Sequence, residues 1–297
     1  MAKRLKSQLE NSKEIKNVLR KANLNYRFNG KLIDIFLIYL PCKDNVCDHS
    51  DFLRVIKDTI MTKFVLSFSE IQNKLSIRNN KGPEELFKKS VRKLSKHTAK
   101  GELGELILFT LLDVYFEAPK ILSKISYKTN RRMAVHGADA VHAQFIDGKL
   151  RLYLGESKMH KKFSNAATYA VDSISSTIEK YTDEFDLIDS HIDFPDMNSE
   201  AKLELLEFLN PFSEQQRFNP EMLYSPCFIG FVEPSVFCDD EKCYLAEYKK
   251  LAKKYIISFY SKLEKQCDVT KTTLLLLPFS SLDVLVDEFI SCMGIDT

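Results

Sequence analysis

Three charged side chains near the middle of the chain have the types and the spacing of a metal-dependent hydrolase site. Glu156 and Lys158 are two residues apart in a strand-like run, and the period of two points both side chains to one face of a strand. Asp139 begins the preceding strand-like run, and the Asp-Gly pair at 147–148 predicts a hairpin turn between the two runs. We therefore expect the two carboxylates and the amine to meet at one end of a sheet.

This set of groups suits the hydrolysis of a phosphodiester bond. Carboxylate oxygens are ligands that Mg²⁺ prefers, and this cation keeps several waters and completes its shell with substrate phosphate. We expect Asp139 and Glu156 to hold Mg²⁺, and Mn²⁺ to substitute for it. The cation would lower the pKa of a bound water and stabilise the charge that develops on the phosphate. Lys158 would orient or deprotonate that water, or offset the charge on the scissile phosphate.

Glu105 is a fourth candidate, because it lies in an apolar helical pattern at 101–116. An acid on a core helix needs a partner, and either the metal or the lysine would serve as one. The alternative is that Glu105 and Glu102 complement the helix dipole in the first turn. For Glu105 the two interpretations stand level, whereas for Glu102 the dipole interpretation is favoured.

The elements that must position these residues predict an α/β protein in which helices cover a mixed sheet. In the C-terminal part, periodicity predicts helix, three strands, helix, strand, helix, strand and helix, at 101–116, 121–127, 140–146, 150–154, 164–184, 227–232, 240–265, 272–278 and from 280. In the N-terminal part, it predicts helices at 5–22, 51–75 and 83–96 and a strand at 31–40. We divide the chain into a smaller basic α/β domain, 1–95, and a larger domain, 96–297.

Charge is distributed unevenly along the 297 residues. Residues 1–100 hold 22 Lys and Arg against 10 Asp and Glu, which gives +12, although the whole chain has a net charge of only +2. Such asymmetry is expected when one face meets a polyanion or an acidic partner.

Composition and motifs exclude several classes of protein. No apolar run approaches the roughly 18 to 20 residues of a membrane span, and the polar N-terminus differs from a secretory signal. The seven Cys, an odd number, are typical of reduced thiols. We therefore expect a cytoplasmic protein that has no membrane partner. The sequence has no P-loop motif, so we expect it to bind no nucleotide cofactor.

Two sets of basic residues are candidate nucleic-acid contacts. One set has helical spacing within 83–96, where it would follow a phosphate backbone towards the site, and a solvated helix face is the alternative. The other set flanks the candidate acids and would clamp substrate strands. The candidates are Lys89, Arg92, Lys93 and Lys96 in the first set, and Lys161, Lys162, Arg131 and Arg132 in the second. We expect structural roles for the flanking His136, His142 and His160, of which His136 would come nearest to substrate.

The helix acid, the strand Asp and the Glu-x-Lys triplet together resemble the signature of the PD-(D/E)XK nucleases. The matching residues are Gly101-x-x-x-Glu105, Gly137-Ala138-Asp139 and Glu156-Ser157-Lys158, with Ala138 in place of the family proline. The family core of helix, three-stranded meander, helix and strand has the order predicted above. The resemblance implies a restriction-endonuclease-like fold in which Asp139, Glu156 and Glu105 share one metal site.

More narrowly, residues 99–185 are similar to the nuclease subunits of the Hachiman anti-phage defence system. The similarity is carried by Gly-Glu-Leu-Gly-Glu at 101–105, His-Gly-Ala-Asp at 136–139 and Gly-Glu-Ser-Lys at 155–158. It implies a bacterial immune effector that a partner helicase of the superfamily 2 type holds in check. The helicase would hydrolyse ATP, sense the invading nucleic acid and free the nuclease to degrade DNA. The basic segment 1–95 would then dock the helicase or contact DNA, and the sequence does not separate these uses.

We expect a Mg²⁺-dependent deoxyribonuclease with little sequence preference, because contacts to the DNA backbone carry no sequence information. Two alternatives stay open. The chain would be a nucleic-acid-binding adaptor for a helicase, without turnover, or it would apply the same chemistry to RNA, which has the same scissile phosphodiester.

Overall fold

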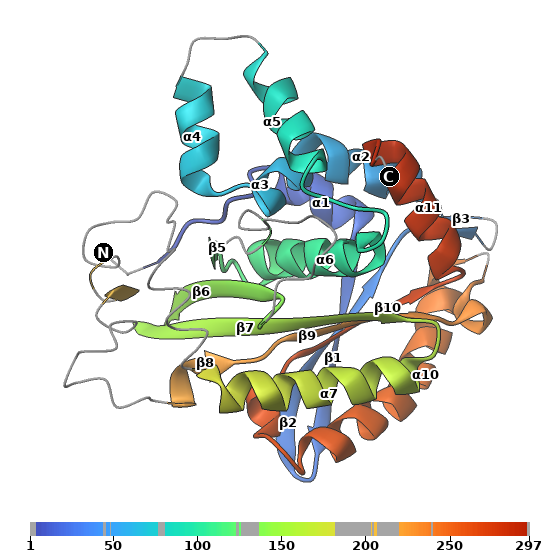
Figure 1. The fold of residues 1–297 in the computed structure, drawn as a ribbon. Coiled ribbons are helices and arrows are strands. Elements are labelled where there is room, and N and C mark those ends of the chain that lie inside the picture. Colours follow the sequence, from blue (N-terminus) through green and yellow to red (C-terminus); the bar gives the residue numbers. More distant parts are fainter. Residues whose placement is uncertain are drawn as a thin grey trace.

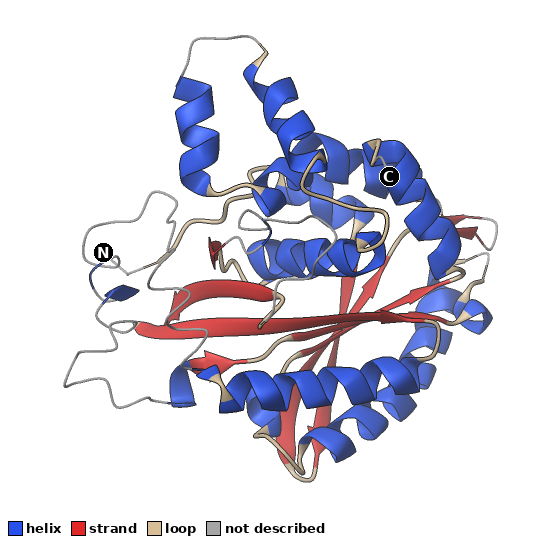
Figure 2. Cartoon of the chain, viewed as in Figure 1, coloured by secondary structure: helices blue, strands red, loops and turns tan. Residues whose placement is uncertain are grey.

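The computed structural model describes residues 4–43, 46–47, 49–76, 81–122, 125, 137–181, 203, 205–206, 220–238 and 240–295. Within them, a mixed sheet, whose strands are red in Figure 2, has the strand order β1-β2-β10-β9-β7-β6-β5, and β8 pairs with β7 beside this path. Its strands are β1 (Arg20–Phe28), β2 (Lys31–Tyr39), β5 (Lys120–Leu122), β6 (Ala140–Ile146), β7 (Lys149–His160), β8 (Leu223–Tyr224), β9 (Cys227–Val232) and β10 (Leu274–Phe279). A separate small hairpin pairs β3 (Cys42–Lys43) with β4 (Val46–Cys47).

The middle of the sheet is parallel and its edges are antiparallel. Strand β10 pairs in parallel with both β2 and β9, and β9 pairs in parallel with β7. The hairpin of β1 and β2 forms one edge, and the antiparallel strands β5, β6 and β7 form the other. Parallel strands that are covered on both faces need continuous apolar runs. Strand β10 meets this need with Leu-Leu-Leu-Leu-Pro-Phe, in which every residue is buried.

Helices cover both faces of the sheet and give a three-layer arrangement (Figure 1). One layer holds α1 (Ser12–Val18), α2 (Ser50–Val55), α3 (Met61–Val65), α6 (Ala99–Tyr115) and α11 (Leu282–Met293), and the other holds α7 (Phe163–Glu179) and α10 (Glu241–Leu263). Alternate residues of β10 serve the two layers: Leu275 and Leu277 pack with the first, and Leu274 and Leu276 with the second. Helices α4 (Phe68–Ser76) and α5 (Gly82–Val91) extend from the first layer, and we refer to these two helices as the arm.

The predicted fold class, a mixed sheet flanked by helices, is confirmed. The elements predicted at 31–40, 101–116, 140–146, 227–232 and 240–265 correspond to β2, α6, β6, β9 and α10. The division of the chain at residue 95 stays a prediction. In the structure, the first part supplies β1 and β2 to the shared sheet, and α1 to α3 to the same core cluster as α6.

Three predicted helices differ from the structure. The helix at 5–22 is wrong over most of its length, because only Ser12–Val18 is helical and Arg20–Phe28 forms β1, which pairs with β2 along its whole length. The helix at 83–96 ends at Val91, and residues 92–98 form turns. The helix at 51–75 is interrupted at Leu66, whose backbone is extended between α3 and α4. In each case tertiary pairing or a local break overrides the hydrophobic period.

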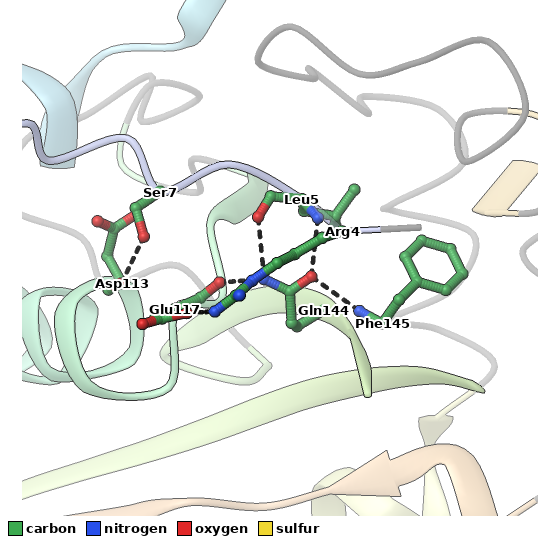
Figure 3. Close-up of polar contacts among 7 residues, drawn as sticks. All are labelled: Arg4, Leu5, Ser7, Asp113, Glu117, Gln144 and Phe145. Carbon is green, nitrogen blue, oxygen red and sulfur yellow. Dashed lines mark hydrogen bonds and ion pairs between the residues drawn. The ribbon is translucent and has the colours of Figure 1, made fainter. Parts of the chain in front are cut away.

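The N-terminal segment at 4–9 has no regular secondary structure and is bound to the core (Figure 3). The amide of Leu5 donates to Gln144 Oε1 at 2.8 Å, and Gln144 Nε2 donates back to the Leu5 carbonyl at 3.0 Å. Arg4 forms an ion pair with Glu117 just after α6. The buried Gln144 side chain on β6 therefore makes the two hydrogen bonds with Leu5 that a neighbouring strand would otherwise make.

Asp113 near the end of α6 holds the same segment one step further along. Its carboxylate accepts the amides of Gln8 at 2.8 Å and Leu9 at 3.0 Å, and its backbone carbonyl accepts the Ser7 hydroxyl at 2.9 Å. Burial raises the pKa of the Asp113 carboxyl, and the two amide donors oppose this effect. A buried carboxylate is tolerated here because it satisfies two backbone amides of a segment that belongs to no sheet.

Replacement of Asp113 by Ala should lower the free energy of unfolding by about 2 kcal/mol, because the amides of Gln8 and Leu9 lose a charged acceptor. The free energy of unfolding of Asp113→Asn should lie between those of the wild type and Asp113→Ala, since an amide offers only one acceptor oxygen. Urea denaturation measures the stability, and hydrogen exchange should show lost protection at residues 8 and 9 while β6 and β7 stay protected. Asp283→Ala, at an exposed ion pair, is the control. Equal losses for Asp113→Ala and Asp283→Ala would contradict this assignment.

Candidate active site

The hairpin of β6 and β7 brings two candidate residues to the same level. The register pairs Ala140 with Gly155, so Asp139 and Glu156 follow as neighbours at the end of the ladder. The amide of Asp139 donates to the Gly155 carbonyl at 2.9 Å, and the amide of Ser157 donates to Asp139 Oδ2 at 2.8 Å. These two bonds fix both the backbone and the carboxylate of Asp139 against β7.

The turn that sets this register is the predicted one. Asp147 and Gly148 separate β6 from β7, and both have positive φ, 51° and 73°. Two such residues form the hairpin turn whose twist matches the flanking strands. A slip of one residue would move Glu156 to the opposite face of the sheet, so the turn sequence determines where the candidate acid lies.

Glu156 and Lys158 point to the same face of β7, as predicted, and their side chains form an ion pair. The second carboxylate oxygen of Glu156, Oε2, accepts the Ser173 hydroxyl of α7 at 2.7 Å. The Glu156 side chain is 3% exposed and that of Lys158 is 28% exposed, so the pair lies between the core and solvent. A buried ion pair needs further hydrogen bonds to offset its desolvation, and Ser173 supplies one.

The charges of the site act on one another. Burial and the nearby Asp139 carboxylate raise the pKa of Glu156 to about 8, against the opposing effects of Lys158 and Ser173. Burial alone would lower the pKa of Lys158, but the carboxylates of Glu156 and Asp139 raise it above its ordinary value. Lys158 therefore keeps its positive charge, and Glu156 resists ionisation beside the Asp139 carboxylate. A bound cation would lower the pKa of Glu156 and favour its ionised form.

Gly104 allows α6 to lie against the other face of β7. A Cβ atom at this position would stand 2.5 Å from Ser157 Oγ and 3.2 Å from both Cγ and Sδ of Met159. Ser157 and Met159 therefore face α6, whereas the ion pair described above faces α7. The close approach of α6 also brings its acid, Glu105, to the level of the hairpin end.

Glu105 approaches Asp139 from α6. Both residues line a cavity of about 20 Å³, together with Lys120 and His142, and this volume suffices for one water. The cavity lies on the α6 face of the sheet. Within the described ranges, no three or more His, Cys, Asp or Glu side chains are grouped to hold a metal ion. The sharing of one metal by Asp139, Glu156 and Glu105 stays a prediction.

Two polar residues beside the cavity have structural partners. His142 Nδ1 lies 2.7 Å from the Ala118 carbonyl, and burial lowers the pKa of His142 to about 3. The ring is neutral near pH 7 and must carry its proton on Nδ1 to make this bond, which agrees with the expected structural role. Lys120 Nζ donates to the carbonyls of Phe64 and Leu66, each at 3.0 Å, where α3 ends. This buried lysine, which the sequence analysis missed, caps the helix.

The candidate basic residues do not form one continuous stripe, because α5 ends at Val91 and α6 begins at Ala99. Lys89 pairs with Glu70 of the arm at 2.6 Å, and Lys161 pairs with Asp283 of α11 at 2.6 Å. The other described candidates are the exposed Arg92, Lys96 and Lys162 and the half-buried Lys93, whereas Arg131, Arg132 and His136 lie outside the described residues.

Helix α7 contributes residues that the sequence analysis did not assign to the site. Ser173 bonds to Glu156, and Tyr169, one turn earlier on the same side of α7, packs against His160 with ring centroids 5.4 Å apart. A helical period does predict that positions 169 and 173 share a stripe. It does not predict that this stripe lies over β7, because that is a tertiary contact.

The fold and the site define an α/β protein whose sheet carries, at the end of one hairpin, two neighbouring carboxylates and a lysine. The family model of HamA matches residues 6–292, nearly the whole chain, and the chain therefore belongs to the HamA family. This membership makes it a component of the Hachiman anti-phage defence system and confirms the resemblance found in residues 99–185. No curated protein matches the sequence. Among the described helices, none combines the length and the apolar character that a membrane crossing requires.

Gly104→Ala should destabilise the protein, whereas Gly101→Ala on the same helix should stabilise it. Both changes favour the helix by about 0.5–1 kcal/mol. A Cβ at Gly101 meets nothing within 4 Å, but one at Gly104 meets Ser157 and Met159, so α6 must shift at a cost of about 1–3 kcal/mol. Urea denaturation of the two variants measures the difference. Equal stabilities would rule out the close approach of α6 to β7.

Glu156→Gln should flatten the pH dependence of stability. The folded-state pKa of about 8 lies above the ordinary value of 4.5, so between these values the folded protein holds a proton that the unfolded chain has released. Stability should therefore fall as the pH rises from about 5 to 8. Denaturation across this range, without divalent cations, should find the variant increasingly more stable than the wild type. Glu179→Gln, at an exposed acid, is the control, and its stability should depend on pH as that of the wild type does. The same pH dependence in Glu156→Gln and the wild type would refute the raised pKa of Glu156.

Proposed function

We propose that the chain is a Mg²⁺-dependent nuclease that cleaves DNA phosphodiester bonds with little sequence preference. One observation carries the proposal: Asp139 and Glu156 are close enough for the Asp139 charge to raise the pKa of Glu156, and Lys158 lies beside them at the border with solvent. Perturbed carboxylates of this kind are more common at functional sites than elsewhere. The order α6, β5, β6, β7, α7, β9 also agrees with the PD-(D/E)XK core.

The donor set fits a hard divalent cation. Asp139 and Glu156 present carboxylate oxygens that repel each other, and Mg²⁺ requires only one or two such groups in addition to waters and substrate phosphate. These two residues would hold the cation, with Glu105 of α6 as an auxiliary acid, and Mn²⁺ would substitute. When bound, the cation would supply an activated water and stabilise negative charge on the phosphate.

The chain's own residues prepare the remaining parts of the reaction. The Ser157 amide holds the Asp139 carboxylate in place, and the Ser173 hydroxyl does the same for Glu156. The Lys158 ammonium, whose pKa is raised by both acids once burial is overcome, stays charged at neutral pH and offsets charge on the scissile phosphate. Partial burial strengthens these interactions relative to those in water.

Charge and family membership support the proposed substrate and partner. Exposed Lys96, Lys162 and Arg92 would contact the phosphate backbone, and such contacts would give little sequence preference. A partner helicase of the superfamily 2 type would control the nuclease within the Hachiman system. The basic segment 1–95, which includes the arm, would dock this partner or guide nucleic acid.

A binding module without turnover is the second candidate. Both oxygens of Glu156 already have protein partners, Lys158 and Ser173, which is also the arrangement of a structural ion pair. Such an adaptor would recruit the helicase to nucleic acid without any need for a divalent cation. RNA as the substrate would leave the chemistry unchanged and is separated only by experiment.

Cleavage of supercoiled plasmid tests the function. We expect nicking with Mg²⁺ or Mn²⁺ and none with EDTA, with the chain alone or together with the helicase and ATP. Asp139→Ala and Lys158→Ala should each lower the rate at least about a hundredfold, because each removes a charged group that acts on the reacting phosphate. Lys253→Ala, on α10, is the matched control.

The same assay separates the alternatives. If wild type and variants are inert in every condition but still bind DNA or the helicase, the adaptor replaces the nuclease. If structured RNA is cut and plasmid is not, the substrate assignment changes and the catalytic residues stand.

A further inference from the structure

A row of side chains extends from the candidate active site along β7. Glu156, Lys158 and His160 alternate with residues that face α6, so they share the face covered by α7. Helix α7 follows β7 after a short turn and runs back over it: Ser173 bonds to Glu156, and Tyr169 packs on His160. Two rings therefore end the row that begins with the catalytic carboxylate, about 7 Å beyond Lys158 by the spacing of a strand.

Tyr169 differs from the other aromatic side chains of the described chain. It is 53% exposed, and the other large apolar residues exposed to this extent are aliphatic. Its neighbours Ala166 and Ala170 are fully buried, so α7 itself is firmly seated. The ring lies at 39° to the ring of His160, which supports it from the protein side and leaves the rest of it open to solvent.

Positive charge surrounds this pair of rings. The pKa of His160 is lowered by burial and by the charges of Lys100 and Lys158, which means that both ammonium groups lie within electrostatic reach of the imidazole. Lys100 comes from the first turn of α6, and two exposed lysines follow His160 directly: Lys161, which pairs with Asp283, and Lys162. An open aromatic face flanked by lysines is the combination with which proteins bind unpaired nucleotides, since the ring stacks on a base and the lysines contact phosphates.

We infer that Tyr169, supported by His160, is a stacking platform for an unpaired base next to the scissile phosphate. In a duplex, the faces of the bases are covered by their neighbours, so a protein ring reaches a base face only where the strand is single or locally unwound. The platform thus selects single-stranded or unwound nucleic acid. This inference rests on the proposed nuclease function for its biological meaning, but the binding it describes requires no cleavage.

Binding of fluorescein-labelled oligonucleotides in EDTA tests the platform. The probes are a thymidine oligonucleotide and a hairpin duplex with the same number of nucleotides, followed by fluorescence anisotropy. Tyr169→Ala should weaken single-strand binding about tenfold or more, Tyr169→Phe should retain it, and duplex binding should change little. Leu32→Ala, an exposed apolar residue on β2, is the control for surface truncation. An equal loss for both probes, no loss, or no single-strand binding by the wild type would each overturn the inference.

A direct readout is available because the chain contains no tryptophan. Tyr169→Trp introduces the one tryptophan of the chain, whose emission can be excited apart from that of the tyrosines, and stacking of a base should quench it on addition of the thymidine oligonucleotide. Leu32→Trp should keep its emission. Quenching of both or of neither would count against the platform. The plasmid assay runs in parallel: a wild type that binds single strands through residue 169 but cuts nothing would refute the nuclease and leave the platform standing.

Discussion

The burial of α6 is the constraint on which the rest of the structure depends. The helix is packed between the sheet, α1 to α3 and α11, so its buried polar side chains must find partners inside the protein. Asp113 does so by binding the N-terminal segment, and Glu102 by accepting the Thr98 hydroxyl at 2.7 Å. Glu105 is the acid at the level of the hairpin, where it lines the cavity with Asp139. One apolar helix thus fixes the N-terminus, the turn before itself and a wall of the candidate site.

The two faces of strand β7 have different roles. The face with Ser157 and Met159 is shaped for the close approach of α6, whereas the face with Glu156 carries charge and is covered by α7. Burial of a carboxylate beside another one costs stability, as the raised pKa of Glu156 records. The apolar packing on the α6 face offsets this cost within the same strand. Asp139, at the end of the ladder, is the residue that both faces share.

The sequence predicted those parts of the structure that depend on local patterns. The Asp-Gly turn, the period of two and the apolar helix were enough to bring Glu156, Lys158 and Asp139 together. Strand β1 was missed because the apolar side of this edge strand is formed by Ala22, Leu24 and Tyr26, which are only half-buried. Their period of two is weak and directly follows a stronger helical pattern. Ser173 was missed for another reason: its role depends on how α7 lies over β7, and no periodicity within either element contains that relation. Contacts between elements distant in sequence were therefore the features that sequence patterns did not predict.

The arm bears on how the basic first third is used. Helix α4 has no fully buried residue, and two of its links to α5 are ion pairs, from Lys89 to Glu70 and from Lys74 to Glu85. Exposed pairs of this kind contribute only about 0–1 kcal/mol, so a partner's charges can replace them at little cost. The residues of the β7 row are instead held by the sheet and by α7. A surface with exchangeable pairs suits adaptation to a protein partner, and a rigid row beside the acids suits a strand that must be positioned for chemistry. On this argument the two proposed uses of basic charge would fall on different parts of the molecule, with partner docking on the arm and strand binding along β7.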